Sequence, residues 1–159
     1  MTPSCSLLLT AAVALVMLAL PIRAPAQQAH LIVAAPEEIE WVPAPPSVPP
    51  GAQVAVLFGD PSKEGLFSFR IKFPSGYVVP PHRHPQPEIV TVISGTFCLG
   101  MGEKADKVKT RALPAGSFFA FSPGMAHFGF VEEDTVIQLN STGPWGLSYV
   151  NPADDPRNK

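Results

Sequence analysis

The sequence predicts an all-β protein: a single barrel of two facing antiparallel sheets, preceded by an extended N-terminal arm. Three observations favour this fold. After Gly51 short apolar runs follow one another at regular spacing, turn residues separate them, and no stretch keeps a helical period for ten residues. A length of 159 residues and an apolar fraction of 46% suit one domain with one modest core.

Residues 1–26 have the pattern of an export signal. Leu7 to Leu20 is apolar except for Thr10, and Ala24-Pro25-Ala26 supplies a small-x-small cleavage site. The competing interpretation is a membrane anchor, but the run is shorter than the roughly 18 to 20 apolar residues that span a bilayer. We therefore expect cleavage after Ala26, a periplasmic or secreted protein, and no stable membrane span once the signal is removed.

The two cysteines predict no internal disulfide. Cys5 precedes the apolar run and would leave with the signal, so Cys98 remains as the only thiol of the mature chain. We expect Cys98 to be a small hydrophobic residue on a strand rather than a catalytic thiol.

Residues 27–51 form the predicted arm. The run Pro43-Ala44-Pro45-Pro46-Ser47-Val48-Pro49-Pro50 favours extended polyproline II, because prolines lack the backbone N–H that a helix or sheet requires. The apolar residues near Trp41 could lie across the barrel or across a neighbouring subunit.

Residues 52–150 form the predicted barrel. Within the segment 66–73, the residues Phe67, Phe69, Ile71 and Phe73 fall on one face, and Ser68, Arg70 and Lys72 fall on the other. This alternation is typical of a half-buried strand. Strands are expected at 54–58, 66–73, 77–79, 89–93, 96–101, 117–121, 126–131, 135–139 and 147–150.

The remaining features of the sequence limit the classes of partner that we expect. Residues 151–159 form a polar C-terminal tail with two prolines, expected to be mobile or lightly pinned. The formal net charge is −2, with acids and bases scattered along the chain. This distribution offers no basic surface for nucleic acid or for an anionic membrane.

Three of the four histidines lie in two short segments that predict a metal site. His82 and His84 are two residues apart, so both imidazoles project from one face of an extended chain. Glu88 follows after Pro85-Gln86-Pro87, which bends the chain and lets the carboxylate return to that face. His127, just past the turn Ser122-Pro123-Gly124, is the expected fourth ligand.

This donor set limits the choice of ion. Three neutral imidazoles and one carboxylate suit a divalent transition metal such as Fe, Mn, Zn or Ni, whereas Ca and Mg prefer oxygen ligands. The alternative is that His82 and His84 are turn residues and Glu88 an ordinary surface acid. His30 has no such neighbours in the sequence, and we expect it to be solvated.

Both segments resemble the sequence motifs of the cupin superfamily, specifically a small single-domain cupin that is exported. The first is matched by Gly76, His82, His84, Glu88 and Gly95 at the motif's spacing, and the second by Gly116, Gly124 and His127. Two positions depart from the second motif. Pro123 stands one place late, with Ser122 in its slot, and Val131 replaces the usual Asn.

The resemblance implies a cupin-type double-stranded β-helix, or jelly-roll barrel, with metal ligands at His82, His84, Glu88 and His127. It also implies a homodimer and a small-molecule ligand or substrate. The function that we expect first is that of a metal-dependent enzyme, of the dioxygenase type among oxidoreductases. The alternatives are a cupin isomerase or decarboxylase, and a non-catalytic metal-containing module that binds a sugar or small organic acid.

The sequence does not identify a catalytic acid or base. Tyr77, Gln138 and Glu103 are weak candidates that depend on whether their side chains point at the metal. Arg70 and Lys72 could bind an acidic substrate at the barrel mouth, but a solvated outer face is the preferred interpretation. We expect the phenylalanines near the ligands to line the core; they are Phe97, Phe119, Phe121, Phe128 and Phe130.

Overall fold

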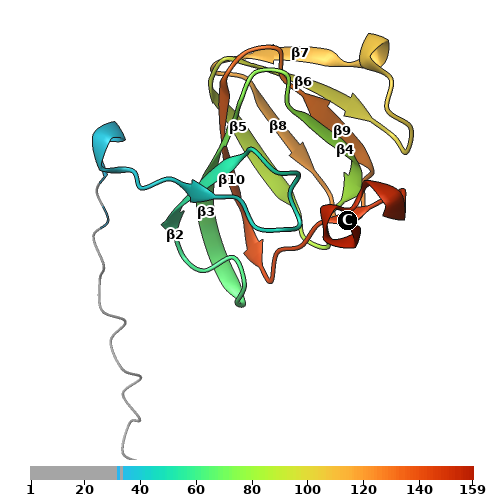
Figure 1. Cartoon of the computed structure of the whole chain (residues 1–159). Helices are drawn as coiled ribbons and strands as arrows, with labels where there is room; N and C mark the ends of the chain where they lie inside the picture. The colour runs from blue at the N-terminus through green and yellow to red at the C-terminus, as the bar shows by residue number, and fades with distance from the viewer. Residues whose placement is uncertain (1–31, 33) are drawn as a thin grey trace, which may run out of the picture. The chain divides into compact units, whose positions relative to one another are not determined.

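The computed structural model of the chain describes Ile32 and residues 34–159 (Figure 1). The predicted signal at residues 1–26, with Cys5, lies outside these residues, and so does His30. They therefore stay predictions from the sequence. None of the helices in the part of the chain that is described is long and apolar enough to cross a bilayer.

Two antiparallel sheets make up the fold, which confirms the predicted all-β jelly-roll class. The six-stranded sheet has the order β1-β2-β3-β10-β5-β8 and the five-stranded sheet the order β11-β4-β9-β6-β7. The strands of the first sheet are β1 (Val42–Pro43), β2 (Gln53–Phe58), β3 (Gly65–Phe73), β5 (Glu88–Ser94), β8 (Phe118–Phe121) and β10 (Thr135–Gly143). Those of the second are β4 (Val78–Arg83), β6 (Thr96–Met101), β7 (Arg111–Pro114), β9 (His127–Phe130) and β11 (Ser148–Tyr149). The 3-10 turns are η1 (Pro36–Glu38), η2 (Lys107–Lys109), η3 (Pro152–Asp154) and η4 (Pro156–Asn158).

The core fills the space between the sheets, as the alternation along β3 predicted. Phe67, Phe69, Ile71 and Phe73 of β3 are all buried, and the residues between them are only partly so. Residues from both sheets join the same hydrophobic cluster, which includes Val90, Ile137 and Leu139 from the first and Val79, Phe97 and Leu113 from the second. The two sheets therefore share one interior.

Strand β4 is longer than expected, because it continues through Pro80 and Pro81 where the sequence predicted its end at Val79. Proline cannot donate to a ladder and is tolerated at an irregularity. Here the register between β4 and β9 shifts between Val79 and His82. The carbonyl of Pro81 still accepts a hydrogen bond from the N–H of Val150, at 2.9 Å. The tolerated prolines let β4 reach His82.

The described part of the arm is fixed to the barrel of its own chain. Strand β1 pairs with β2, and the Ala44 N–H donates to the Ala52 carbonyl at 3.0 Å. Two tyrosine hydroxyls from the barrel donate to arm carbonyls: Tyr149 to Ser47 at 2.9 Å, and Tyr77 to Pro49. The arm is thus part of the barrel wall.

The C-terminal tail is pinned to the barrel, which is the second of the two alternatives expected from the sequence. It forms η3 and η4 and folds back next to β4 (Figure 1). The Arg157 guanidinium pairs with the Asp155 carboxylate at 2.6 Å and donates to the Leu147 carbonyl at 3.2 Å. The prolines that suggested an irregular tail instead begin the two 3-10 turns.

Candidate metal centre

Backbone pairing brings the two histidine segments together. His82 of β4 and His127 of β9 are direct partners across the antiparallel ladder. The turn before β9 is tied to the first segment, because the Gly124 N–H donates to the His84 carbonyl at 2.9 Å and the Arg83 guanidinium donates to the Gly124 carbonyl. Gly124 has a φ of +77°, a conformation that glycine adopts without strain.

Four buried side chains converge at this point. One nitrogen from each of His82, His84 and His127 lies within 4.8 Å of the other two. The carboxylate of Glu88, at the start of β5, reaches two of these rings. Its Oε1 is 3.2 Å from His84 Nε2, and its Oε2 is 3.2 Å from His127 Nε2. All four residues are 4–5% exposed, so water cannot solvate the group freely.

Backbone carbonyls hold the other nitrogen of every ring. His82 Nδ1 bonds to the Pro80 carbonyl at 2.7 Å, His84 Nδ1 to that of Gly146 at 2.7 Å, and His127 Nδ1 to that of Met125 at 3.1 Å. A carbonyl oxygen only accepts, so each Nδ1 carries the proton. In a neutral ring this leaves the Nε2 lone pair free to bind a cation.

The electrostatics favour neutral rings at His82 and His84. Burial lowers the pKa of His82 well below its usual value, and the nearby rings of His127 and His84 lower it further. Burial also lowers the pKa of His84, although the Glu88 carboxylate and the Gly146 carbonyl oppose this shift. The Nε2 lone pair of a neutral His84 ring then faces the Glu88 carboxylate at 3.2 Å.

A cation resolves this arrangement. Acceptors buried without a donor cost free energy, and a buried carboxylate needs a positive partner. Three imidazole nitrogens and one carboxylate form a donor set that suits a divalent transition metal and not Ca or Mg. The three histidines could therefore hold a metal ion, and the Glu88 carboxylate contacts two of them.

Aromatic rings cover the donor cluster. The Trp145 indole stacks on the His84 ring, with centroids 4.8 Å apart and planes 18° apart. The Phe121 ring lies 4.4 Å from that of His127. Trp145 Nε1 is buried without a hydrogen-bond partner, and it is the only buried side-chain nitrogen or oxygen of this kind among residues 34–159. Ring contacts, and not its own donor, therefore hold this indole in place.

Sequence reasoning missed Trp145. The signal that could have found it is an aromatic residue within the short segment Pro144-Trp145-Gly146, directly after β10. Its contact with His84 joins residues more than sixty positions apart, and no local pattern reports such a pair. The expected phenylalanines divide into two groups: Phe97, Phe128 and Phe130 are buried, whereas Phe119 and Phe121 are half-buried.

The structure does not bring the weak catalytic candidates to the cluster. Gln138 lies on the outer face of its sheet, where it accepts a hydrogen bond from Arg70 Nε at 3.1 Å. The Tyr77 hydroxyl donates to the arm at Pro49, and burial raises the pKa of this phenol. Glu103 pairs with Arg83 and is exposed. Each of these groups has its own partner elsewhere.

Arg70 and Lys72 occupy the solvated outer face, as preferred from the sequence. Their neighbours Phe69 and Ile71 point into the core, so the two basic side chains point outward. The Lys72 ammonium lies over the ring of Trp41, 4.3 Å from its centroid. Neither of these basic side chains therefore faces the donor cluster from the barrel interior.

Comparisons with known proteins place this geometry in context. The family model described as "ChrR Cupin-like domain" matches residues 29–145. Germin-like protein 5-1 of Oryza sativa subsp. japonica is 38% identical over 90 residues, which are 56% of this chain and 40% of the relative. Germin-like protein subfamily 2 member 1 of Arabidopsis thaliana is 35% identical over 85 residues, 50% of this chain and 39% of the relative. The chain thus spans about two fifths of the length of these two relatives.

Solved structures share the fold at lower identity. The polyketide cyclase RemF from Streptomyces resistomycificus superposes with a TM-score of 0.64 at 16% identity, covering 80% of this chain and 90% of RemF. KdgF from Halomonas sp. gives a TM-score of 0.55 at 21% identity, covering 72% and 93%. An RmlC-like cupin from Shewanella frigidimarina gives 0.54 at 16%, covering 69% and 87%. At these identities the likeness concerns the fold alone.

Proposed function

This chain belongs to the cupin superfamily, as a member of the ChrR cupin-like family, and from that premise we propose that it is a metal-dependent enzyme acting on a small organic molecule. Within this proposal the reaction type is that of a dioxygenase-like oxidoreductase. The observation that carries it is the convergence of one nitrogen from each of three buried histidines, whose Nδ1 atoms are already bonded, with the Glu88 carboxylate 3.2 Å from the Nε2 atoms of two of them. This arrangement leaves its acceptors without donors.

The proposed ligands are His82, His84, Glu88 and His127, and the proposed cofactor is one divalent ion such as Fe, Mn, Zn or Ni. A bound ion of this kind supplies Lewis acidity and open coordination positions. The carbonyl bonds at Nδ1 fix each ring before the ion arrives, which lowers the entropic cost of binding. Glu88 supplies one negative charge, so a divalent ion keeps a net positive charge towards a substrate.

Other residues of the chain exclude water from the site and orient a bound molecule. The rings of Trp145 and Phe121 cover two of the imidazoles, which keeps the local dielectric low and strengthens electrostatic contacts with a bound molecule. RemF carries the name of a polyketide cyclase on a barrel of this shape, so the fold itself does not choose the reaction. A cupin isomerase or decarboxylase remains compatible with the same ligands.

A specific observation favours a second candidate, a non-catalytic metal-containing module that binds a small molecule. Among the residues described, Tyr77, Gln138 and Glu103 are each bonded elsewhere, so no side chain predicted as an acid or base stands free beside the donors. An enzyme would then have to rely on the metal and the substrate for proton transfer. A binding module would need no such group.

Export and assembly are part of the proposal. We propose cleavage of residues 1–26, a periplasmic or secreted location, and a homodimer, as the cupin resemblance implies. The dimer is supported by exposed apolar side chains on the outer face of the six-stranded sheet, among them Leu66 at 71% and Phe118 at 62% exposure. Light scattering of the purified mature protein measures the assembly state, and its N-terminal sequence locates the cleavage site.

Elemental analysis tests the metal proposal on protein purified from its own compartment, because cytoplasmic expression can load a different ion. His82→Ala and His127→Ala should each lose the metal and lower the melting temperature, since an ion that binds only the folded state stabilises it. His30→Ala, outside both motifs, is the matched control and should keep the metal. Unchanged metal content in both test variants overturns the proposed site.

Oxygen-uptake screening separates the two candidate functions. Loaded protein is offered small diols, catechols and organic acids, and an oxidoreductase consumes oxygen in step with one of them. Saturable binding without turnover of any bound compound would favour the binding module. His82→Ala serves as the control for oxygen consumed without the site.

A further inference from the structure

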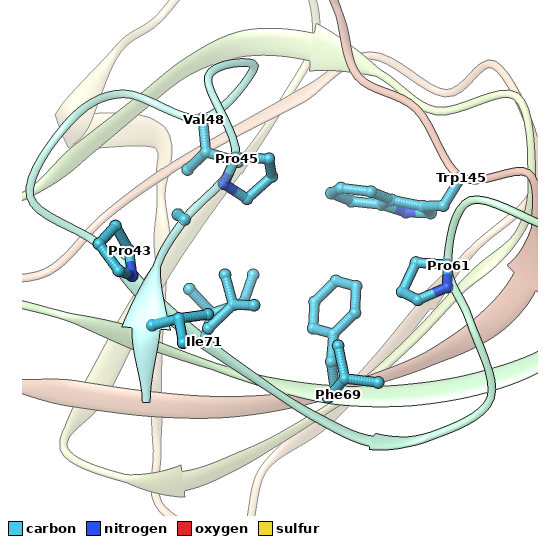
Figure 2. A pocket seen from close by; sticks show the side chains of 11 residues that line it. Pro43, Pro45, Val48, Pro61, Phe69, Ile71 and Trp145 are labelled. Carbon is cyan, nitrogen blue, oxygen red and sulfur yellow. The ribbon is translucent and has the colours of Figure 1, made fainter. Parts of the chain in front are cut away.

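A cavity lies beside Trp145, between the proline-rich arm and the inner face of the six-stranded sheet. Its volume is about 270 Å³. Figure 2 shows Pro45 and Val48 of the arm on one side, Ile71 and Phe69 of β3 below, and Trp145 and Pro61 on the other side. Val56, also in the wall, is 52% exposed, so the cavity has an opening at the edge of β2.

The wall of this cavity is apolar. Among the described residues that line it, none carries a charged side chain and none a side-chain hydroxyl, carboxyl or amide. The basic residues nearest in sequence, Arg70 and Lys72, point to the opposite face of β3. Water in such a space finds few hydrogen-bond partners, so an apolar occupant can displace it at little cost.

Trp145 joins the cavity to the donor cluster. Its indole forms part of the cavity wall, and the same ring stacks on His84. The Phe69 ring meets the indole edge to face, with centroids 5.3 Å apart. A molecule in the cavity therefore lies one aromatic ring away from a proposed metal ligand.

We propose that this cavity binds a small uncharged molecule built on one aromatic ring or a compact branched aliphatic group. Apolar cavities of roughly 150 Å³ are known to bind benzene, so 270 Å³ has room for a substituted ring. A sugar or a dicarboxylate does not fit this chemistry, because its several hydroxyls or its two charges would lose water, and the only polar side-chain group among the lining residues is the indole N–H of Trp145. Binding in this cavity does not depend on the proposed function. Only the identification of the bound molecule as the substrate rests on it.

Tryptophan fluorescence tests the binding. The chain has two tryptophans, and Trp41 does not line the cavity, so Trp41→Phe leaves Trp145 as the sole reporter. Benzyl alcohol should quench or shift its emission in a saturable way, whereas glucose and succinate should leave it unchanged. Saturation by glucose or succinate, or no response to benzyl alcohol, overturns the inference.

A matched pair of arm variants locates the response. Ala44→Phe places a ring in the cavity from the arm side and should weaken benzyl alcohol binding at least tenfold. Ala34→Phe makes the same change on an exposed part of the arm outside the cavity and should bind like the parent. Thermal unfolding of both variants checks that each is folded. Equal binding by the two variants overturns the location.

The test is run on protein as purified and on protein treated with a chelator, which separates this inference from the proposed function. Benzyl alcohol binding without any metal uptake would sink the metal proposal and support the cavity. Metal uptake without benzyl alcohol binding would sink the cavity and leave the metal proposal intact.

Discussion

Replacement of Glu88 by Gln should stabilise the metal-free protein and reduce the further stabilisation that a bound metal adds. Glu88 is 5% exposed and lies 3.2 Å from the Nε2 atoms of His84 and His127. Without an ion, this carboxylate is a buried acceptor facing acceptors. An amide of the same shape can donate to one imidazole, which removes an unsatisfied contact worth about 1 to 3 kcal/mol. The metal-free variant should therefore be more stable than the metal-free parent.

Added metal, in contrast, should stabilise the variant less than it stabilises the parent. A ligand present at 100 times its dissociation constant stabilises the folded state by about 2.7 kcal/mol. Loss of the only anionic ligand should weaken metal binding at least tenfold, which removes about 1.4 kcal/mol of that stabilisation. The increase in melting temperature on adding metal should shrink accordingly, at roughly 3 to 5 °C per kcal/mol for a domain of this size.

Differential scanning calorimetry with and without added Zn²⁺ measures both effects. Glu133→Gln makes the same change at an exposed acid and should leave both melting temperatures within about 1 °C of the parent, because exposed substitutions are usually worth less than about 0.5 kcal/mol. Equal metal-induced shifts in parent and Glu88→Gln would show that Glu88 does not touch the ion. A metal-free variant that melts below its parent would refute the account of the buried carboxylate.

Two further predictions concern the frame around the site. Gly95 has a φ of +71°, and a Cβ there would lie 2.5 Å from Thr135 Oγ1, so Gly95→Ala should cost about 2 to 4 kcal/mol in urea unfolding. Gly76→Ala, with a φ of +77° and no atom within 4 Å, should cost only about 1 to 2 kcal/mol, and equal losses would rule out the clash. Burial raises the pKa of Tyr149 to about 12, so the folded state holds this proton more tightly than the unfolded state, whose pKa is about 10. The resulting stabilisation is fully present below pH 10 and is lost as pH rises towards 12. Tyr149→Phe, which also loses the bond to Ser47, should therefore show a smaller decline in its free energy of urea unfolding between pH 9 and pH 12. A decline equal to that of the parent would contradict this prediction.

The sequence was sufficient for the fold wherever local alternation decides burial. In β3 the period of two separates Phe67 and Phe69 from Arg70 and Lys72 without reference to the rest of the chain. The sequence was insufficient where pairing with another strand decides whether a strand continues. Pro80 and Pro81 look like strand breakers, and only the irregular register with β9 and the bond from Val150 show why β4 continues through them.

The candidate site also has features that the sequence predicted and features that it did not. The spacing of His82, His84 and Glu88 predicted that they lie close together, because one period of a strand and one proline bend are local geometry. The contact of Trp145 with His84 and the apolar cavity beside it were not predictable, since both depend on the arm and on the turn after β10. The sequence therefore indicated the donors, and the structure was needed for their surroundings.

The unusual Val131 becomes understandable from the same geometry. Val131 stands where the cupin motif usually has Asn, and it is 2% exposed within the hydrophobic core. No side-chain amide is needed to orient the rings, because backbone carbonyls of Pro80, Gly146 and Met125 already hold all three Nδ1 atoms. A carbonyl position depends on chain geometry and not on residue identity, so the orientation of the donors can persist while neighbouring side chains change. The other departure from the motif, Ser122 and Pro123 in the turn, is accommodated in a similar way. The turn is tied to the His84 carbonyl by the backbone N–H of Gly124 and not by a side chain. The orientation of the proposed ligands therefore depends on the path of the backbone through the barrel.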